Sequence, residues 1–132
     1  MGRGPSSLGD LVAHGSTADI YAWGRHAVVK VLRPGIPDGW ADREAEVTSL
    51  VHRAGLPAPA TDGVVRVAGR PGIVFERIEG PSLWDGIVAG DVAVEAAIDR
   101  FAGLQAELFR ARPVPGLPSL AARLAAKIAE AD

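Results

Sequence analysis

The sequence predicts an α+β fold: a five-stranded antiparallel sheet with one helix between strands three and four, followed by helices. Short apolar runs separated by glycine- and proline-containing turns fill most of the first 80 residues, and this pattern is typical of antiparallel strands. The segment 40–54 differs, because its apolar residues recur at helical spacing. After residue 80 only helical patterns follow. Strands that come first and helices that come later favour α+β over a parallel α/β sheet.

Composition limits the class of protein. The 132 residues suffice for one ordinary domain or part of a larger one, and 48% hydrophobic with 23% charged residues indicates a globular chain. A net charge of −2 gives no electrostatic case for nucleic acid or an acidic membrane surface. The absence of cysteine excludes disulfides and thiolate metal sites. No apolar run resembles a membrane span or a signal peptide, so we expect a cytoplasmic protein, and the Ala-, Gly- and Arg-rich composition suggests a bacterial source.

The first half is predicted to contain three short strands, 8–14, 20–23 and 27–32, joined as an antiparallel meander. The small-residue turn Gly15–Asp19 and the tight connection 24–26 link them. Residues 33–39 form a loop, and Asp38 is expected to cap a helix from about residue 40 to 54. Gly55, followed by two prolines, ends that helix.

The second half is predicted to contain strands at 64–67 and 73–78, separated by a turn at 68–72. Ser82 and Asp85 fit a capping box for a short helix that reaches about residue 88. A longer helix is expected from Asp91 to about residue 110, followed by a proline-rich linker at 112–118 and a last helix at 119–131. The apolar stripe of the long helix consists of Val94, Ile98, Phe101, Ala102, Leu108 and Phe109.

Lys30 is a charged residue inside the apolar strand 27–32. The chain has two lysines against twelve arginines, which indicates that lysine is specifically required here. Because burial of an unpaired charge is costly, Lys30 needs a partner. Two partners are available: an anion over the glycine-containing turn upstream, and a glutamate on the helix that follows. Alternatively, the strand is an edge strand and the ammonium group reaches water.

The turn Gly15–Asp19 can bind an anion, because glycine and small residues let backbone N–H groups approach phosphate oxygens. With a single glycine it is equally compatible with an ordinary hairpin. Two glutamates on the helix, Glu44 and Glu46, can reach Lys30. They lie at opposite borders of the apolar face, ~70° and ~90° from its centre at ~100° per residue, so Glu44 is slightly better placed. The alternative is that both belong to a solvated helix flank.

The strand at 73–78 ends at a glycine-containing break that can act as a hinge. If this strand lies at an edge, its unpaired backbone groups can bond an adenine edge; otherwise it is an ordinary strand end. No single feature is specific, but their order is. The order is strand, small-residue turn, strand, strand with lysine, helix with glutamate, two strands and a hinge.

This order is the layout of a protein-kinase amino-terminal lobe, and the chain resembles the aminoglycoside phosphotransferase family, a branch of the kinase-like fold. The resemblance covers about residues 8–132. Four stretches carry it: His14-Gly15-Ser16-Thr17-Ala18-Asp19-Ile20-Tyr21; Val28-Val29-Lys30-Val31; Arg43-Glu44-Ala45-Glu46 leading to Gly55-Leu56-Pro57-Ala58-Pro59; and Ile73-Val74-Phe75-Glu76-Arg77-Ile78-Glu79-Gly80-Pro81-Ser82-Leu83.

The resemblance implies that the chain binds ATP, with Mg²⁺ held by a carboxy-terminal lobe. Gly15, Ser16 and Thr17 would lie over the ATP phosphates. Lys30 would hold the α- and β-phosphates, and Glu44 would orient Lys30 through an ion pair.

The same resemblance assigns roles near the hinge. Phe75 would take the gatekeeper position behind the adenine. The Glu76 carbonyl and the Ile78 amide would bond the adenine edge. The acceptor of the phosphoryl group would be a small molecule with a hydroxyl group, bound largely by the carboxy-terminal lobe.

The sequence departs from the family in its second half. The family's catalytic loop, His-x-Asp-x-x-x-x-Asn, is absent, and all three histidines lie before residue 53. We therefore expect no catalytic or metal-binding residue in this chain and no phosphotransferase turnover from it alone. Residues 8–80 are predicted to form the nucleotide-binding lobe, and 81–132 a helical linker to the carboxy-terminal lobe.

The main alternative is a non-catalytic nucleotide-binding or protein-interaction module. Without a second lobe, the cleft face would expose apolar surface, including the stripe of the 91–110 helix, and could mediate self-association. A third reading is a small α+β domain without a nucleotide site. No nucleic-acid or membrane partner is expected.

Overall fold

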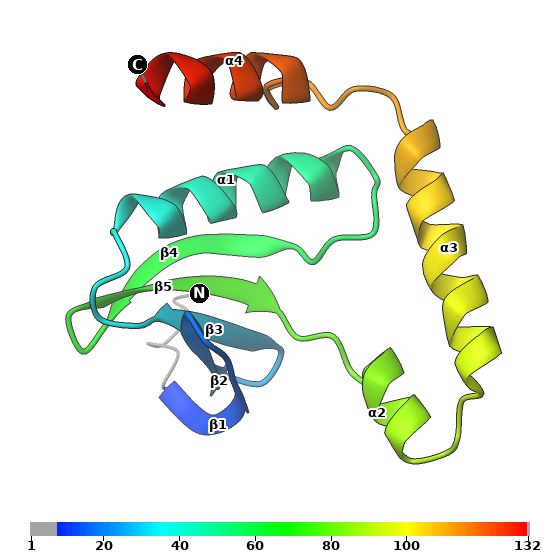
Figure 1. Cartoon of the computed structure of the whole chain (residues 1–132). Coiled ribbons are helices and arrows are strands. Elements are labelled where there is room, and N and C mark those ends of the chain that lie inside the picture. Colours follow the sequence, from blue (N-terminus) through cyan, green and yellow to red (C-terminus); the bar gives the residue numbers. More distant parts are fainter. Residues whose placement is uncertain (1–7, 132) are drawn as a thin grey trace.

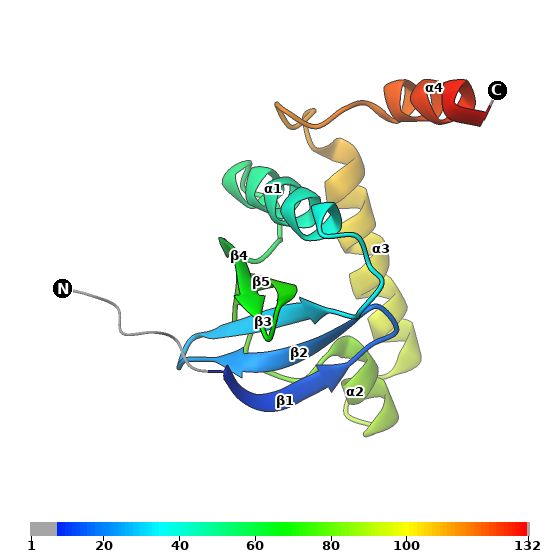
Figure 2. The ribbon, with the colours of Figure 1, turned by 90° about the vertical axis from the view of Figure 1, so that its left-hand side faces the viewer.

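The computed structural model describes residues 8–131 and contains a five-stranded antiparallel sheet, one helix over the sheet and three further helices (Figure 1). Helix α1 covers one face of the sheet. Helix α3 stands at the end of the sheet where β5 leaves it, and α4 extends back at a level above α1 but displaced to one side of it (Figures 1 and 2). The elements are β1 (Leu8–His14), β2 (Ala18–Trp23), β3 (Ala27–Leu32), α1 (Gly39–Arg53), β4 (Thr61–Val67), β5 (Arg70–Glu76), α2 (Leu83–Val88), α3 (Val94–Arg110) and α4 (Leu120–Ala131).

The sheet order is β1-β2-β3-β5-β4, and every neighbouring pair is antiparallel. The predicted α+β architecture with its five-stranded sheet is confirmed. Strand β3 is the central strand, with Lys30 opposite Ile20 on one side and Ile73 on the other. The edge-strand alternative for Lys30 is therefore wrong. Strand β5 is also internal, and β4 is the edge, so the expectation of an edge at β5 is wrong too.

The core lies on both faces of β3, because successive side chains of a strand point to opposite faces. Val29 and Val31 pack with Val74 on the face away from α1. Leu32 and Ile73 pack on the other face. The cluster under α1 is completed by the small residues Ala18, Ala41 and Ala45, which let the helix approach the sheet closely.

Several predicted boundaries shift. The turn predicted at 68–72 is a two-residue turn, Ala68–Gly69, in which both residues have positive φ (48° and 77°). This is the backbone of a type I′ turn, whose twist matches that of the flanking strands. Residues 70–72 therefore belong to β5, which ends at Glu76 rather than at residue 78. Strand β4 begins at Thr61, three residues early, with a register shift next to Gly63.

Asp38 occupies the N-cap position of α1, as predicted, but its side chain does not cap the helix. The Asp38 backbone is already helical, and its side chain accepts no hydrogen bond from the helix. The carboxylate instead pairs with the Arg66 guanidinium on β4. A long-range ion pair has replaced a local cap, which a pattern confined to neighbouring residues does not reveal.

The later helices agree better with the sequence. The predicted capping box is present, since the Ser82 hydroxyl accepts from the Asp85 N–H at 3.0 Å and the Asp85 carboxylate accepts from the Ser82 N–H at 3.1 Å. Helix α3 begins at Val94, three residues after the predicted start. Helix α4 begins beside Ser119, whose hydroxyl accepts from the Ala122 N–H at 3.1 Å. Within residues 8–131, no helix is long and apolar enough to cross a membrane.

Candidate functional site

Lys30 and Glu44 form the ion pair at the centre of the candidate site. The Lys30 ammonium donates to both oxygens of the Glu44 carboxylate, at 2.7 and 3.0 Å. Lys30 comes from the central strand, and Glu44 from the face of α1 that covers the sheet. The side chains are 26% and 39% exposed, so water still reaches the pair. Glu46, the other sequence candidate, is exposed and forms no ion pair with the described residues.

The loop Gly15–Thr17 connects β1 to β2 and lies beyond Lys30 along the sheet. Its base is closed by a hydrogen bond from the Gly15 N–H to the Ala18 carbonyl, 3.0 Å long. Ser16 and Thr17 are exposed. Within residues 8–131, neither the Ser16 nor the Thr17 amide has a recorded hydrogen-bond acceptor. Free, exposed N–H groups in a small-residue loop are suited to bind an anion.

Arg33, just past the end of β3, holds this loop. Its guanidinium donates to the Gly15 carbonyl through Nε at 3.0 Å and Nη2 at 2.7 Å. Its backbone N–H donates to the Thr17 carbonyl at 2.9 Å. Nη2 also reaches the Asp19 carboxylate at 3.2 Å. The same Asp19 oxygen lies 2.7 Å from His14 Nδ1, so the carboxylate joins the two strands that carry the loop.

A pocket of about 390 Å³ opens at the other end of the site, between β1, β2, β3 and the segment after β5. Val28 and Ile20 line it together with Phe75, which lies opposite Val28 in the sheet register. The Ile78 amide, past the end of β5, makes no hydrogen bond within the described residues. The Glu76 N–H is already bonded to the Ala60 carbonyl, at 2.9 Å. The remaining residues of the lining are Val12, Ala13, Pro59, Glu76, Arg77, Glu79 and Gly80.

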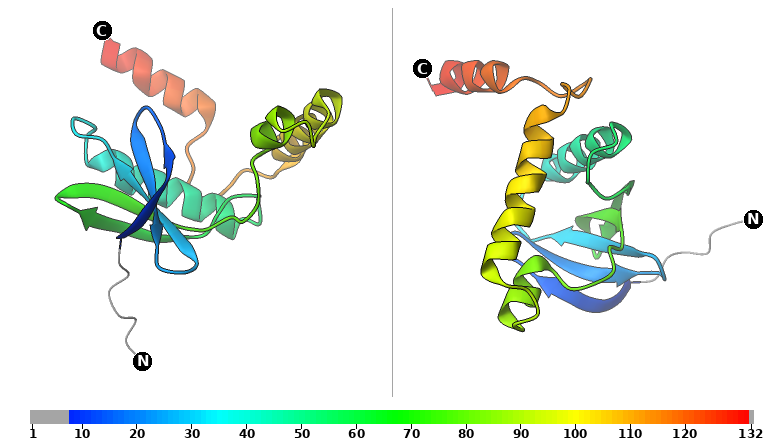
Figure 3. Two further views of the ribbon diagram at one scale, coloured as in Figure 1. Left: turned by 90° about the horizontal axis from the view of Figure 1, so that it is seen from below. Right: turned by 90° about the vertical axis from the view of Figure 1, so that its right-hand side faces the viewer.

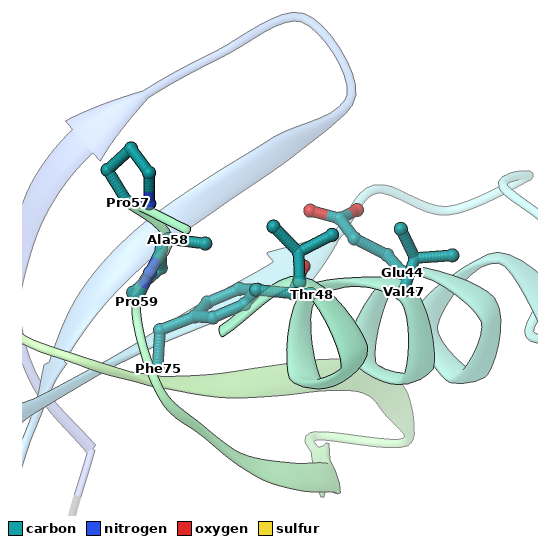
Figure 4. Close-up of a pocket in the computed structure, with 8 residues that line it drawn as sticks. Glu44, Val47, Thr48, Pro57, Ala58, Pro59 and Phe75 are labelled. Atoms are coloured by element: carbon teal, nitrogen blue, oxygen red, sulfur yellow. The ribbon is translucent and has the colours of Figure 1, made fainter. Parts of the chain in front are cut away.

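A second pocket, of about 410 Å³, lies between α1 and the proline-containing segment 57–59 (Figure 4). Phe75 and Pro59 line both pockets and therefore lie between them. Glu44 projects from α1 at the end of the second pocket away from Pro59 (Figure 4). The other residues of its lining are Val47, Thr48, Val51, Pro57 and Ala58.

These parts are aligned along one face of β3. Val28, Lys30 and Leu32 alternate with the buried valines and so share the α1 face. At ~3.3 Å per residue, Lys30 is ~7 Å from Val28 and ~7 Å from Leu32. Leu32 pairs with Ala18, next to the loop. An apolar pocket, a paired ammonium group and a loop with free amides thus follow one another over ~13 Å.

The structure therefore brings most of the predicted residues to one face. Gly15, Ser16 and Thr17 form the loop, Lys30 and Glu44 pair, and Phe75 lines the pocket at the hinge. Glu76 and Ile78 lie at its rim. That these residues bind a nucleotide remains a prediction.

Sequence reasoning missed three contributors. Ile20 and Val28 could have been found, because they are two residues or one cross-strand pair away from positions already on the Lys30 face. Arg33 has no such signal. Its contact with the Gly15 carbonyl spans the width of β2 and depends on the register of two hairpins.

A metal site is not evident in the described part of the chain. No three histidine, aspartate or glutamate side chains gather there in a way that could hold a metal ion. The residues present suit an anion better than a cation, since the loop offers N–H groups and Lys30 offers an ammonium group.

Comparison with known proteins adds little. No family model matches the sequence, and no curated protein matches it. Among solved structures, a co-crystal structure of WbdD with the kinase inhibitor LY294002 is similar over 60% of this chain, with 23% identity and a TM-score of 0.41. Another crystal structure of WbdD is similar over 56%, with 24% identity and a TM-score of 0.38. The matched part spans about one fifth of the WbdD chain (20% and 19%).

Proposed function

We propose that this chain is the ATP-binding lobe of a kinase-like small-molecule phosphotransferase, related in design to the aminoglycoside phosphotransferases that its sequence resembles. The observation that carries the proposal is the ion pair between Lys30 of the central strand and Glu44 of α1, in which two hydrogen bonds are 2.7 and 3.0 Å long. A lysine held between an apolar pocket and a loop with free amides is suited to bind the phosphates of a nucleotide.

Each part of the site has a role under this proposal. The apolar pocket lined by Ile20, Val28 and Phe75 takes the base, because such a pocket removes a flat ring from water. Lys30 neutralises phosphate charge, and Glu44 keeps its ammonium group in one place. The loop amides of Ser16 and Thr17 donate to phosphate oxygens.

Under this proposal we do not expect the chain to supply the chemistry that follows binding. It has no His-x-Asp sequence that could provide a catalytic base. Its described residues contain no carboxylate cluster for Mg²⁺. The metal ligands, the base and the site for the hydroxyl acceptor are proposed to belong to a carboxy-terminal lobe. Binding of ATP, rather than turnover, is therefore the property to test on these 132 residues.

The test compares ATP and adenosine binding by calorimetry in the unsubstituted chain, Lys30→Ala and Lys127→Ala. Lys127 is the only other lysine and lies on α4, so it controls for the loss of one positive charge. Charge-assisted hydrogen bonds contribute about 1.5–3 kcal/mol, so Lys30→Ala should weaken ATP binding ~10–100-fold and leave adenosine binding unchanged. Equal ATP affinity in Lys30→Ala and the unsubstituted chain contradicts the proposal, as does an unsubstituted chain that binds no ATP.

A second function is favoured by one observation, the apolar surface of α3. Phe101 is 59% exposed and Phe109 is 86% exposed. Large exposed apolar patches mark interaction surfaces, so a role as a protein-interaction module, including self-association, is the alternative. Light scattering over a concentration series tests it, since a chain that stays monomeric and binds ATP favours the first function alone.

A further inference from the structure

Arg33 contacts the Gly15–Thr17 loop on both of its sides. The guanidinium holds the Gly15 carbonyl with two N–H groups, at 3.0 and 2.7 Å, and the Arg33 backbone N–H holds the Thr17 carbonyl at 2.9 Å. Two carbonyls of one short loop thus point toward the same residue. No other side chain in the described part of the chain has a recorded hydrogen bond to this loop.

The orientation of these carbonyls fixes the orientation of the neighbouring amides. In a trans peptide the C=O and N–H groups of one plane point in opposite directions. The structure contains no cis peptide bond among its described residues. When the Gly15 carbonyl faces Arg33, the Ser16 N–H therefore faces away from it. By the same reasoning the Thr17 carbonyl directs the Ala18 N–H away from Arg33.

Arg33 is itself held in place, as a residue that orients the loop must be. The Asp19 carboxylate, only 14% exposed, accepts from Nη2 at 3.2 Å. His14 lies against both groups. Its Nδ1 is 2.7 Å from the same Asp19 oxygen, and Arg33 Nη2 lies 2.8 Å from Nε2 and 3.1 Å from Nδ1 of its ring. Because Asp19 balances the guanidinium charge, Arg33 is suited to orient the loop rather than to bind a phosphate directly.

We propose that Arg33 is a positioning residue, which orients the Gly15–Thr17 loop so that its free amides present a preformed anion site to the phosphates of the bound nucleotide. This inference rests on the proposed ATP-binding function. It adds a residue outside the nucleotide pocket on which phosphate binding depends and base binding does not.

The experiment uses Arg33→Gln, Arg33→Lys and the control Arg25→Gln. Arg25 lies in the exposed turn between β2 and β3 and makes no hydrogen bond within residues 8–131, so the control removes one arginine without touching the loop. Calorimetry measures ATP and adenosine affinity for each variant. Backbone ¹⁵N relaxation without nucleotide measures the order of the Ser16 and Ala18 amides, which share peptide planes with the two held carbonyls, and of the Thr17 amide between them.

We expect Arg33→Gln to weaken ATP binding ~5–20-fold, as loss of one or two hydrogen bonds to an ordered carbonyl predicts. Adenosine affinity should change less than ~2-fold, and the order of the loop amides should fall. Arg33→Lys should recover part of both effects, since an ammonium group can bond one carbonyl but lacks the fork. Arg25→Gln should behave as the unsubstituted chain.

The outcomes separate this inference from the function on which it rests. If the unsubstituted chain binds no ATP, the proposed function is wrong. If Arg33→Gln nevertheless lowers the order of the loop amides, Arg33 orients the loop but has no role in phosphate binding. Unchanged order of the loop amides in Arg33→Gln overturns the proposed role of Arg33, whatever the change in ATP affinity. Equal losses of ATP and adenosine affinity also overturn it, because they indicate general damage to the fold.

Discussion

The molecule has two regions that differ in the burial of their apolar residues. The first region is the sheet together with α1, and the second consists of the three later helices, α2, α3 and α4. In the first region Ile73 and Val29 are fully buried. In the second region, Ala97 is the only apolar residue of α2, α3 and α4 that belongs to the core of the described chain. Leu83 and Ile87 of α2 are half-buried. The other larger apolar side chains there are exposed: Trp84, Val88, Val94, Ile98, Phe101, Leu104, Leu108, Phe109, Leu120, Leu124 and Ile128.

This difference in burial shows that an amphipathic pattern can have two roles. In the first region the apolar face of α1 meets the sheet, and the pattern stabilises the fold. In the second region α3 has an equally clear stripe, but within residues 8–131 little packs on it, and the helix stands beside the sheet rather than over it (Figure 3). A stripe that is regular and unburied is available for contacts with other surfaces.

The largest expected loss of stability comes from a substitution in the buried first region. Ile73→Ala removes a fully buried side chain from the cluster between the sheet and α1, and should lower the free energy of unfolding by about 2–5 kcal/mol. The matched change Ile98→Ala, at a side chain 61% exposed, should alter it by no more than about 0.5 kcal/mol. Urea denaturation measures both. Comparable losses at the two positions would show that α3 is packed in solution.

A smaller effect concerns two glycines, one in each region. A Cβ added at Gly72 would lie 2.8 Å from Val29 Cγ2, and one at Gly86 would lie 2.7 Å from Val92 Cγ2. Val29 is locked in the core, so Gly72→Ala should cost about 1–3 kcal/mol. Val92 is only partly buried and can move, while alanine favours the helix, so Gly86→Ala should stay within about 1 kcal/mol. Thermal unfolding ranks the two, and a larger loss at Gly86 would reverse the comparison.

The smallest effect is a local pH dependence at α2. The hydrogen bonds that Asp85 accepts from the Ser82 side chain, and then from its backbone, hold the pKa of the Asp85 carboxyl below its ordinary value of 3.8. A lowered folded-state pKa stabilises the first turn of α2 above pH 3.8, and the contribution is lost as the pH falls through the lowered pKa. Amide exchange at Asp85 should therefore accelerate, relative to α1, on acidification. Asp85→Asn should remove that pH dependence, and its persistence would exclude the capping box as the cause.

The sequence was sufficient for the order of elements and for the face of the sheet on which the site lies. Alternation along the strand that contains Lys30, and helical spacing around Glu44, placed these two residues within reach of each other. Both rules are local and follow from backbone geometry. The short turn at Ala68–Gly69 was missed because a proline and a glycine next to it imitate a longer one.

The features that failed are those that depend on distant parts of the chain. Asp38 fits a helix cap locally, yet it pairs with Arg66 on an edge strand. Arg33 appears as one surface arginine among many, yet it holds the loop across β2. Such contacts follow from the register of strands that are far apart in the sequence, which a single sequence does not state.

Sheet order also has a kinetic consequence. Strands β1, β2 and β3 pair through short connections, as do β4 and β5, so each of these hairpins can form early. The pairing of β3 with β5 joins Ala27 to Glu76 and must close the long segment that contains α1. Lys30 lies on β3, where the β1-β2-β3 meander pairs with the β4-β5 hairpin. We therefore expect the candidate site to form in the slow step of folding, at the same time as the complete sheet.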